Sequence, residues 1–313
     1  MRIISASRRT DIPAFYAPWL LGCLEQGYCH WINPYDGQVN YVSLRPEDCV
    51  GIVFWTRFPG LLVGQARRLA GRGYRFYFQF TITDYPAPLE THKPKLDRAV
   101  HAFRALADAI SPERVFWRYD PILLSEATPL SYHLQKFEEL AQALEGATRR
   151  CYFSIIDLYN KTQRNLRQAG IAVRQPSLEE RRALIRDLRD LAMPRGITLY
   201  SCCEDDLVGE GVEKAHCVDS EVFCRLWPEL KVQLPARPTR AQCGCIESID
   251  IGAYDTCIFG CVYCYATSSR QAALERLRAH DPADTVLWRP PEWRGRLLPV
   301  GPPDGASELR VLP

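Results

Sequence analysis

The chain has 313 residues, of which 47% are hydrophobic, and its formal net charge is +2. These are the values of an ordinary globular protein, and so small a net charge gives no indication of a nonspecific nucleic-acid binder. No apolar run reaches the ~18 residues that a membrane span needs, and no signal peptide opens the chain, so we expect a cytoplasmic protein with reduced thiols.

Strand and helix signals alternate along the first 204 residues. Strands are predicted at Arg2–Ser7, Val50–Thr56, Arg75–Thr83, Arg114–Pro121, Cys151–Tyr159 and Ile197–Glu204. Helices are predicted at Ala14–Gln26, Leu61–Ala70, Leu96–Ile110, Leu130–Leu144 and Ser177–Met193, the last beginning with a capping box. Such alternation indicates a parallel sheet, and no Gly-rich dinucleotide fingerprint follows the first strand. We therefore predict an α/β fold, a TIM-like partial (β/α)6 barrel over residues 1–204, with ligands at the carboxyl ends of the strands.

The rest of the chain departs from this pattern. Residues 29–42 read as a turn-rich insertion. Residues 205–280 are expected to form a cysteine-rich iron–sulfur segment that folds over the strand ends, with helices at Val218–Trp227 and Ala266–His280. Residues 281–313 are Pro-rich, and we expect a tail that wraps the surface or is partly disordered.

Three cysteines, Cys257, Cys261 and Cys264, have the spacing C-x3-C-x2-C on one short loop. Three thiolates can hold three corners of a cubane 4Fe–4S cluster and leave its fourth iron without a protein ligand. A zinc site needs four ligands and usually takes them from C-x2-C pairs, so it fits this loop less well. Zinc, free thiols and a disulfide remain the alternatives.

This spacing, with Tyr263 just before the last cysteine, resembles the motif of the radical S-adenosylmethionine (SAM) superfamily. The resemblance implies that Cys257, Cys261 and Cys264 ligate the cluster, that the open iron chelates SAM, and that Tyr263 packs near the adenine. In that superfamily the motif usually follows the first barrel strand, whereas here it lies near the C-terminus.

A second metal site is predicted from four further cysteines. Nine of the thirteen cysteines lie between residues 202 and 264, a crowding that indicates metal binding. Our hypothesis is a second 4Fe–4S cluster ligated by Cys203, Cys217, Cys243 and Cys245, with Cys202 as an alternative to Cys203 and structural zinc as the competing interpretation. The others are expected in the core: Cys23, Cys29, Cys49, Cys151 and Cys224.

Polar side chains follow the predicted strands, where α/β proteins carry their chemistry. The candidates for binding SAM or substrate are Ser7, Arg8, Arg9, Thr10, Asp11, Thr56 and Gln79. The candidate catalytic residues are Arg118, Asp120, Asp157 and Glu204. Either arginine of the pair Arg8–Arg9 could hold a carboxylate with two hydrogen bonds. A surface ion-pair cluster around Arg8 and Arg9, and a buried Arg118–Asp120 pair, are the structural alternatives.

Several motifs together resemble the uncharacterised domain-of-unknown-function family 1848. They are Ser5–Pro13, Phe54–Thr56, Trp117–Pro121 and Cys243–Ala266. The resemblance implies a C-terminal cysteine cluster similar to that of radical SAM proteins, and it implies no substrate.

The sequence therefore predicts a radical SAM-type iron–sulfur enzyme that acts on an unknown small molecule and takes electrons from a reductant such as flavodoxin or ferredoxin. Two alternatives remain. One is a non-catalytic iron–sulfur electron carrier, which would not need polar strand ends. The other is a zinc-knotted, metal-dependent barrel enzyme, although the chain shows no paired His/carboxylate spacing typical of such sites.

Overall fold

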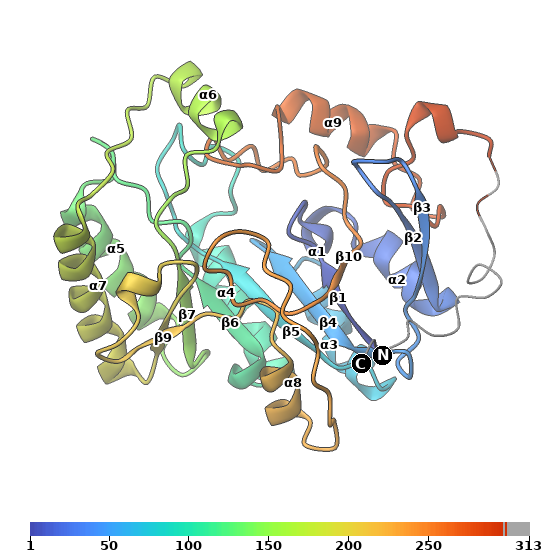
Figure 1. The fold of residues 1–313 in the computed structure, drawn as a ribbon, viewed down its shortest axis with the longest axis horizontal. Helices are drawn as coiled ribbons and strands as arrows, with labels where there is room; N and C mark the ends of the chain where they lie inside the picture. The colour runs from blue at the N-terminus through green and yellow to red at the C-terminus, as the bar shows by residue number, and fades with distance from the viewer. Residues whose placement is uncertain (297, 299–313) are drawn as a thin grey trace.

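The computed structural model describes residues 1–296 and 298, and its centre is an eight-stranded parallel sheet (Figure 1). The strands are β1 (Arg2–Ala6), β4 (Cys49–Thr56), β5 (Phe76–Thr81), β6 (Val115–Arg118), β7 (Arg150–Phe153), β8 (Thr198–Ser201), β9 (Val212–Lys214) and β10 (Ile249–Asp250). Their order is β10-β1-β4-β5-β6-β7-β8-β9, and every neighbouring pair is parallel. Within the described residues β9 and β10 form opposite edges, so the sheet does not close into a barrel.

One face of the sheet, the outer face, is covered by helices. The packed helices are α2 (Ala17–Gln26), α3 (Leu62–Gly71), α4 (Leu96–Ile110), α5 (Leu130–Ala143) and α7 (Leu178–Ala192). Phe54, Phe78 and Trp117 are fully buried against them, and each such side chain stabilises the fold by about 1.5–3 kcal/mol. Because successive strand residues point to opposite faces, Val53, Tyr77 and Phe116 lie on the other side.

The opposite, inner face is covered by a late stretch of the same chain, residues 215–246, which we call the inner segment. Its helix α8 (Ser220–Leu226) buries Val222 and Phe223 against the strands, and the segment can be followed across the sheet in Figure 1. Gly51 of β4 is required for this packing, since a Cβ there would lie 2.1 Å from the Phe223 ring. The inner segment therefore occupies the space that an empty barrel interior would leave.

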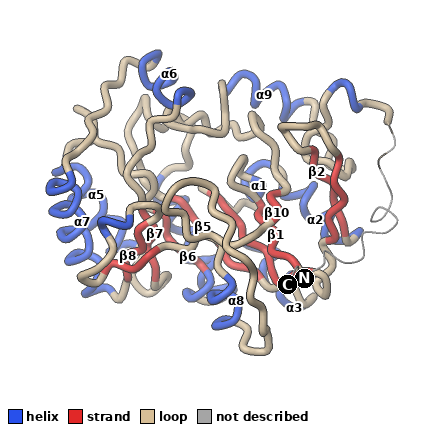
Figure 2. Tube along the Cα trace, in the orientation of Figure 1, coloured by secondary structure: helices blue, strands red, loops and turns tan. Residues whose placement is uncertain are grey.

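The remaining elements surround the sheet, as the coloured tube in Figure 2 shows. They are α1 (Ile12–Phe15), the antiparallel hairpin of β2 (Tyr28–Ile32) and β3 (Val39–Ser43), α6 (Asn160–Gln168), α9 (Arg270–Arg278) and the short 3-10 turns η1 (Pro112–Arg114), η2 (Met193–Arg195), η3 (Asp205–Leu207) and η4 (Pro291–Trp293). The chain after α9 packs on the hairpin: the His30 amide donates to the Thr285 carbonyl (2.8 Å), and Val286 and Leu287 are buried.

The α/β class and the parallel sheet are confirmed, and all six predicted strands are present, five of them shorter than predicted and β4 one residue longer. The capping box is also present, with Ser177 and Glu180 exchanging side-chain and backbone hydrogen bonds. Several details differ from the predictions. The helix predicted at Ala14–Gln26 divides at Tyr16, residues 29–42 form a regular hairpin, and α6, β9 and β10 were not predicted. Of the predicted tail, residues 297 and 299–313 lie outside the described residues. No helix in the described part of the chain is long and apolar enough to span a membrane.

Candidate functional site

The three cysteines of the C-x3-C-x2-C motif lie on a closed loop, residues 255–266, which we call the cysteine loop. The Asp255 amide donates to the Ala266 carbonyl (3.0 Å) and closes its neck, with Asp255 in a left-handed conformation (φ 56°). Gly260 in the x3 spacer has φ 67°, a conformation that side-chain-bearing residues rarely adopt. Cys257, Cys261 and Cys264 are all half-buried free thiols.

Residues that follow the sheet strands hold this loop at their carboxyl ends. The Tyr16 hydroxyl donates to the Thr256 carbonyl (2.8 Å), and the Phe15 and Phe259 rings pack with centroids 4.6 Å apart. The Val262 amide donates to the carbonyl of Leu89, which follows β5 (3.1 Å). The contacts lie at the edge of the parallel sheet where α/β proteins bind ligands.

A buried polar network joins the loop to the ends of β4 and β5. Nη2 of Arg57 donates to Thr83 Oγ1 (2.9 Å), to Glu90 Oε1 (2.5 Å) and to the Tyr263 hydroxyl (2.7 Å). Tyr263 also donates to Glu90, and Glu90 has no exposed side-chain surface. Burial lowers the pKa of Arg57, but the charge of Glu90 outweighs it and raises that pKa well above its usual value. Arg57 therefore stays charged as the buried partner of Glu90. We call this group the Arg57 network.

The Asp11 carboxylate is hydrogen-bonded to three groups around the same strand ends. Its carboxylate accepts from the Ala14 amide (3.0 Å), Thr56 Oγ1 (2.8 Å) and the Arg57 amide (2.6 Å). Burial raises the pKa of Asp11 to about 7, although these three donors lower it. Asp11 and Thr56 therefore fix the start of α1 and the end of β4.

Asp250 of β10 holds the end of β1 in the same way. It accepts from Ser5 Oγ (2.9 Å), Ser7 Oγ (2.6 Å) and the Arg8 amide (2.8 Å). Gly252 follows, and a Cβ there would lie 2.1 Å from Ser7 Oγ. The predicted binding residue Ser7 is therefore a structural link between the first and last strands of the sheet.

Gln79 and Arg118 lie on the inner face and hold the inner segment. Gln79 Nε2 donates to the Cys217 carbonyl (3.0 Å), and Arg118 Nη1 lies 3.3 Å from Gln79 Oε1 and 3.2 Å from Cys217 Sγ. Nη2 of Arg118 pairs with Asp120, which also accepts from Ser154. The buried Arg118–Asp120 pair, which the sequence left as an alternative, is the arrangement observed.

The other two predicted catalytic carboxylates also have cationic partners. Asp157 is exposed and pairs with Arg240 of the inner segment. Glu204 pairs with Arg181 of α7 at 3.0 Å, and burial raises the pKa of Glu204 despite that charge.

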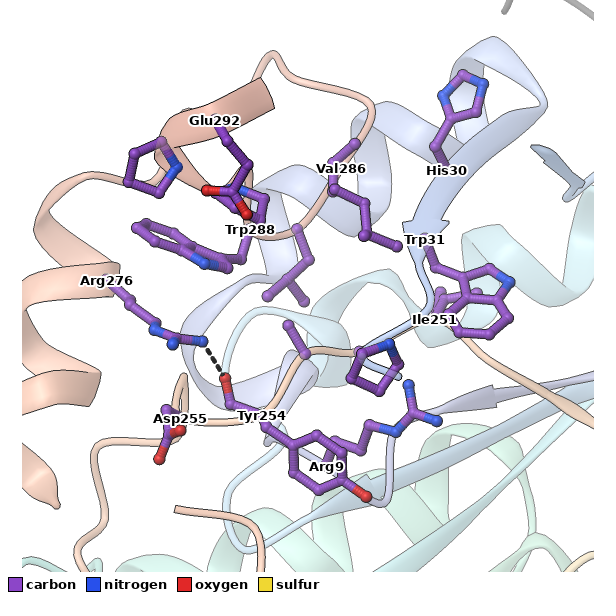
Figure 3. A pocket seen from close by; sticks show the side chains of 17 residues that line it. Arg9, His30, Trp31, Ile251, Tyr254, Asp255, Arg276, Val286, Trp288 and Glu292 are labelled. Atoms are coloured by element: carbon purple, nitrogen blue, oxygen red, sulfur yellow. Dashed lines mark hydrogen bonds between the residues drawn. The ribbon is translucent and has the colours of Figure 1, made fainter. Parts of the chain in front are cut away.

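Arg9 points into a cavity of about 390 Å³ between the hairpin, the chain after β10 and the residues that follow α9 (Figure 3). Its guanidinium lies 5.5 Å from the Trp31 ring and 5.2 Å from the Tyr254 ring. On the other side, Arg276 donates to the Tyr254 carbonyl (2.7 Å) and lies over Trp288. Aromatic walls with cationic edges suit a planar or anionic ligand.

A more open cleft of about 300 Å³ lies beside this cavity and shares Tyr254 with it. Its other lining residues are Tyr159, Lys161 and Tyr265, and Tyr265 is the residue after Cys264. The cleft therefore leads from solvent to the edge of the cysteine loop.

The second predicted set of cysteines also meets in the fold. Cys217 and Cys245 belong to one buried cluster, and Cys203 and Cys243 pack against it. The fifth thiol, Cys202, lies 3.5 Å from Cys217 and 3.8 Å from Cys203 between sulfur atoms.

The donor sets fit thiolate-bound metals by chemistry, while the sulfur positions are not preformed. In the part of the chain that the structure describes, no group of three or more His, Cys, Asp or Glu side chains is placed so that it could hold a metal ion. Three buried polar atoms near the cysteine loop have no hydrogen-bond partner among the described residues: Arg8 Nη2, Thr10 Oγ1 and Glu90 Oε2. Unpaired buried polar atoms are costly, and a bound ligand is one way to satisfy them.

Residues 3–266 match the model of a family described as a domain of unknown function, DUF1848. The chain belongs to the DUF1848 family. The match includes both cysteine groups and every predicted site residue. No curated protein matches the chain.

The similar solved structures are distant. One is a putative alpha-L-fucosidase from Bacteroides thetaiotaomicron, with 10% identity, a TM-score of 0.28 and coverage of 75% of this chain and 85% of that chain. Two are morphinone reductase in complex with tetrahydroNAD, one of them a point mutant, with 15% and 14% identity and TM-scores of 0.29 and 0.28. They cover 71% and 70% of this chain, which spans 59% and 58% of theirs.

Sequence reasoning missed Arg57, Glu90 and Asp250. Arg57 directly follows the predicted strand end at Thr56, so its position carried a usable signal. Glu90 and Asp250 had none, because Glu90 lies in a turn, Asp250 lies in the two-residue strand β10, and each gains its partners through contacts distant in sequence.

Proposed function

We propose that this protein is a radical SAM-type iron–sulfur enzyme in which Cys257, Cys261 and Cys264 hold a 4Fe–4S cluster with one open iron. A reduced cluster held there would supply the electron that cleaves SAM to a 5′-deoxyadenosyl radical. The observation that carries the proposal is the position of a three-thiol loop at the carboxyl ends of parallel strands. The six central strands pair in sequence order, as in a partial (β/α)6 barrel.

In this proposal the Arg57 network holds the loop rigid while the cysteines turn their sulfur atoms toward the cluster. Tyr263 is anchored by its hydroxyl, and its half-buried ring remains available to pack against the adenine. Glu90 Oε2 is a free acceptor for an amino or hydroxyl group of SAM, and Thr10 Oγ1 is free to donate or accept. Satisfying these buried atoms would add binding free energy that an empty site lacks.

Arg8 and Arg9 have different places in the proposal. The Arg8 guanidinium lies 5.0 Å from the Trp55 ring, among buried groups. Burial lowers its pKa, but the charges of Cys245, Asp250 and Cys217 outweigh this and raise it. Arg9 lines the cavity of Figure 3. We therefore assign Arg9, rather than Arg8, to an anionic group of the substrate, which would approach through the cleft beside Tyr265.

The test is anaerobic incubation of the iron- and sulfide-reconstituted protein with SAM and dithionite, or with reduced flavodoxin or ferredoxin. We expect 5′-deoxyadenosine from the wild type, and none from Cys257→Ala, Cys261→Ala or Cys264→Ala. The matched control is Cys224→Ala, because Cys224 is a half-buried thiol of α8 that belongs to neither group.

Two results would contradict the proposal. A fully loaded cluster that leaves SAM intact, and whose electron paramagnetic resonance does not change on SAM addition, would favour an electron carrier. A loop that retains zinc and takes up no iron would favour the zinc-knotted alternative.

A further inference from the structure

Five thiols meet between the end of β8 and the inner segment, and we call them the thiol ring. Cys202 contacts Cys203 and Cys217, with sulfur–sulfur distances of 3.8 and 3.5 Å. Cys245 lies in the same buried cluster as Cys202 and Cys217, and Cys203 and Cys243 pack against that cluster. All five are free thiols, contributed by separate parts of the chain. Five buried cysteines pack no better than small apolar side chains would, so packing alone does not explain why cysteines occupy these positions.

The backbone around the ring is held in conformations that side chains disfavour. Cys203 and Gln242, which precedes Cys243, have φ angles of 64° and 57°. Gly244, between the two cysteines of that loop, packs against the His216 ring, and a Cβ there would lie 2.9 Å from it. Non-glycine residues keep such conformations where the surrounding structure demands them, most often at functional sites.

Three arginines surround the ring. Arg118 Nη1 lies 3.2 Å from Cys217 Sγ, and Arg240 Nη2 lies 4.0 Å from Cys202 Sγ. The Arg8 guanidinium is electrostatically coupled to Cys245 and Cys217. Arg118 and Arg240 also pair with Asp120 and Asp157, which balance part of this charge. Four thiolates around a divalent ion would leave two negative charges, which nearby arginines would stabilise.

We propose that the thiol ring binds one divalent metal ion, zinc, through a tetrahedron of four thiolates from Cys203, Cys217, Cys243 and Cys245. Zinc–sulfur bonds of about 2.3 Å place tetrahedral sulfurs roughly 3.8 Å apart, and the spare thiol Cys202 lies 3.8 Å from the Cys203 sulfur and 3.5 Å from the Cys217 sulfur, so the thiols are packed on the scale of a single ion. The four ligands would close on the ion as it binds, because no described group is already placed to hold one. The thiolates of a cubane sit at its four corners and do not touch one another, so the contacts favour one ion over the expected second 4Fe–4S cluster.

The site would be closed and structural. It fastens the inner segment to the end of β8, and it has no open position for substrate. Cys202 is then the spare fifth thiol, packed beside the ligands. The proposal does not depend on the proposed radical chemistry, because it concerns different cysteines and a metal without redox activity.

The decisive measurement is zinc and iron content of protein expressed with both metals, in the wild type and in a Cys257→Ala/Cys261→Ala/Cys264→Ala triple variant. We expect about one zinc per chain in both proteins, with iron absent from the triple variant only. Cys243→Ala and Cys217→Ala should lose the zinc, while Cys202→Ala and the control Cys224→Ala should keep it. Failure of the proposed function would alter the iron of the wild type and leave this zinc in place.

X-ray absorption at the zinc edge of the wild-type protein tests the same point without a substitution that could unfold the chain. Four sulfur neighbours at about 2.3 Å would support the site. The proposal is overturned by about four irons per chain that persist in the triple variant. It is equally overturned by a metal-free thiol ring, or by a Cys202–Cys217 disulfide found by mass spectrometry of unreduced protein.

Discussion

Nη2 of Arg57, at the end of β4, donates to the Tyr263 hydroxyl at 2.7 Å, which ties the first 90 residues to the cysteine loop near the other end of the chain. Because Glu90 is buried with Arg57, this contact lies in a place where hydrogen bonds are strong and unpaired groups are costly.

Replacing Tyr263 with Phe should loosen the loop while leaving the Arg57–Glu90 pair intact. We expect a loss of roughly 1–2 kcal/mol in unfolding free energy and faster release of loop-bound iron to a chelator. Urea unfolding and iron-release kinetics measure the two effects. Tyr265→Phe is the control, because that hydroxyl donates to the Arg8 carbonyl from an exposed side chain and should matter little. Equal effects of the two variants would contradict the special position of Tyr263.

Glu90→Gln should be far more damaging, since it leaves the buried Arg57 guanidinium without a counter-charge. A loss of about 3–5 kcal/mol is expected from thermal or urea unfolding. The comparison variant is Glu25→Gln, which breaks the exposed Arg68–Glu25 pair and should cost less than about 1 kcal/mol. If the two losses were similar, the Arg57 network would not be a buried charge pair in solution.

A methyl group at Gly252 should separate the first strand from the last. The added methyl group of Gly252→Ala would collide with Ser7 Oγ and disturb the hydrogen bond from Ser7 to Asp250. We expect the variant to lose about 1–3 kcal/mol of unfolding free energy. Gly64→Ala in α3 is the matched control, because its Cβ meets nothing within 4 Å. That control should gain up to about 1 kcal/mol from helix propensity. If Gly252→Ala left the unfolding free energy unchanged, the close packing of β1 against the chain after β10 would be contradicted.

His133 of α5 should make the fold acid-sensitive. Burial lowers its pKa to about 4 from 6.5, while the Leu123 carbonyl accepts from its Nε2 and Tyr119 lies 3.0 Å from its Nδ1. Between those pH values the unfolded chain binds a proton that the folded chain does not. Unfolding free energy should therefore fall by up to about 3 kcal/mol as pH drops through this window.

Urea unfolding from about pH 7 to about pH 5 gives the slope, and His133→Gln should flatten it. The control is His101→Gln on the exposed side of α4, which should keep the wild-type slope. If the unfolding free energy of His133→Gln depended on pH as steeply as that of the wild type, other groups would cause the acid sensitivity.

Sequence patterns predicted the parts of the fold that depend on local chemistry. The apolar run Val50–Phe54 could only be a strand buried on both faces, and Ser177 with Glu180 specified the start of α7. By contrast, α6 buries only Thr162 and Leu166. Its sequence therefore lacks the regularly spaced apolar residues by which a helix is predicted.

What the sequence did not predict depends on contacts between distant residues. β10 has two residues, and it becomes a strand only because β1 offers a free edge. Gln79 and Arg118 point to the inner face as their alternation requires, but the sequence could not tell that residues 215–246 would meet them there. The grouping of cysteines into two sets was readable from spacing, whereas their relation to Arg57, Glu90 and Arg8 was not.

The position of β1 between β4 and β10 has a consequence for biosynthesis. Ile4 pairs with both Ile52 and Ile249, so one edge of β1 stays unpaired until residue 249 has been synthesised and has left the ribosome. An open parallel border invites pairing with other chains. A nascent chain that stalls before residue 249 should therefore be prone to aggregate and to need chaperones, and the late arrival of the cysteine loop would delay metal loading until that border is covered.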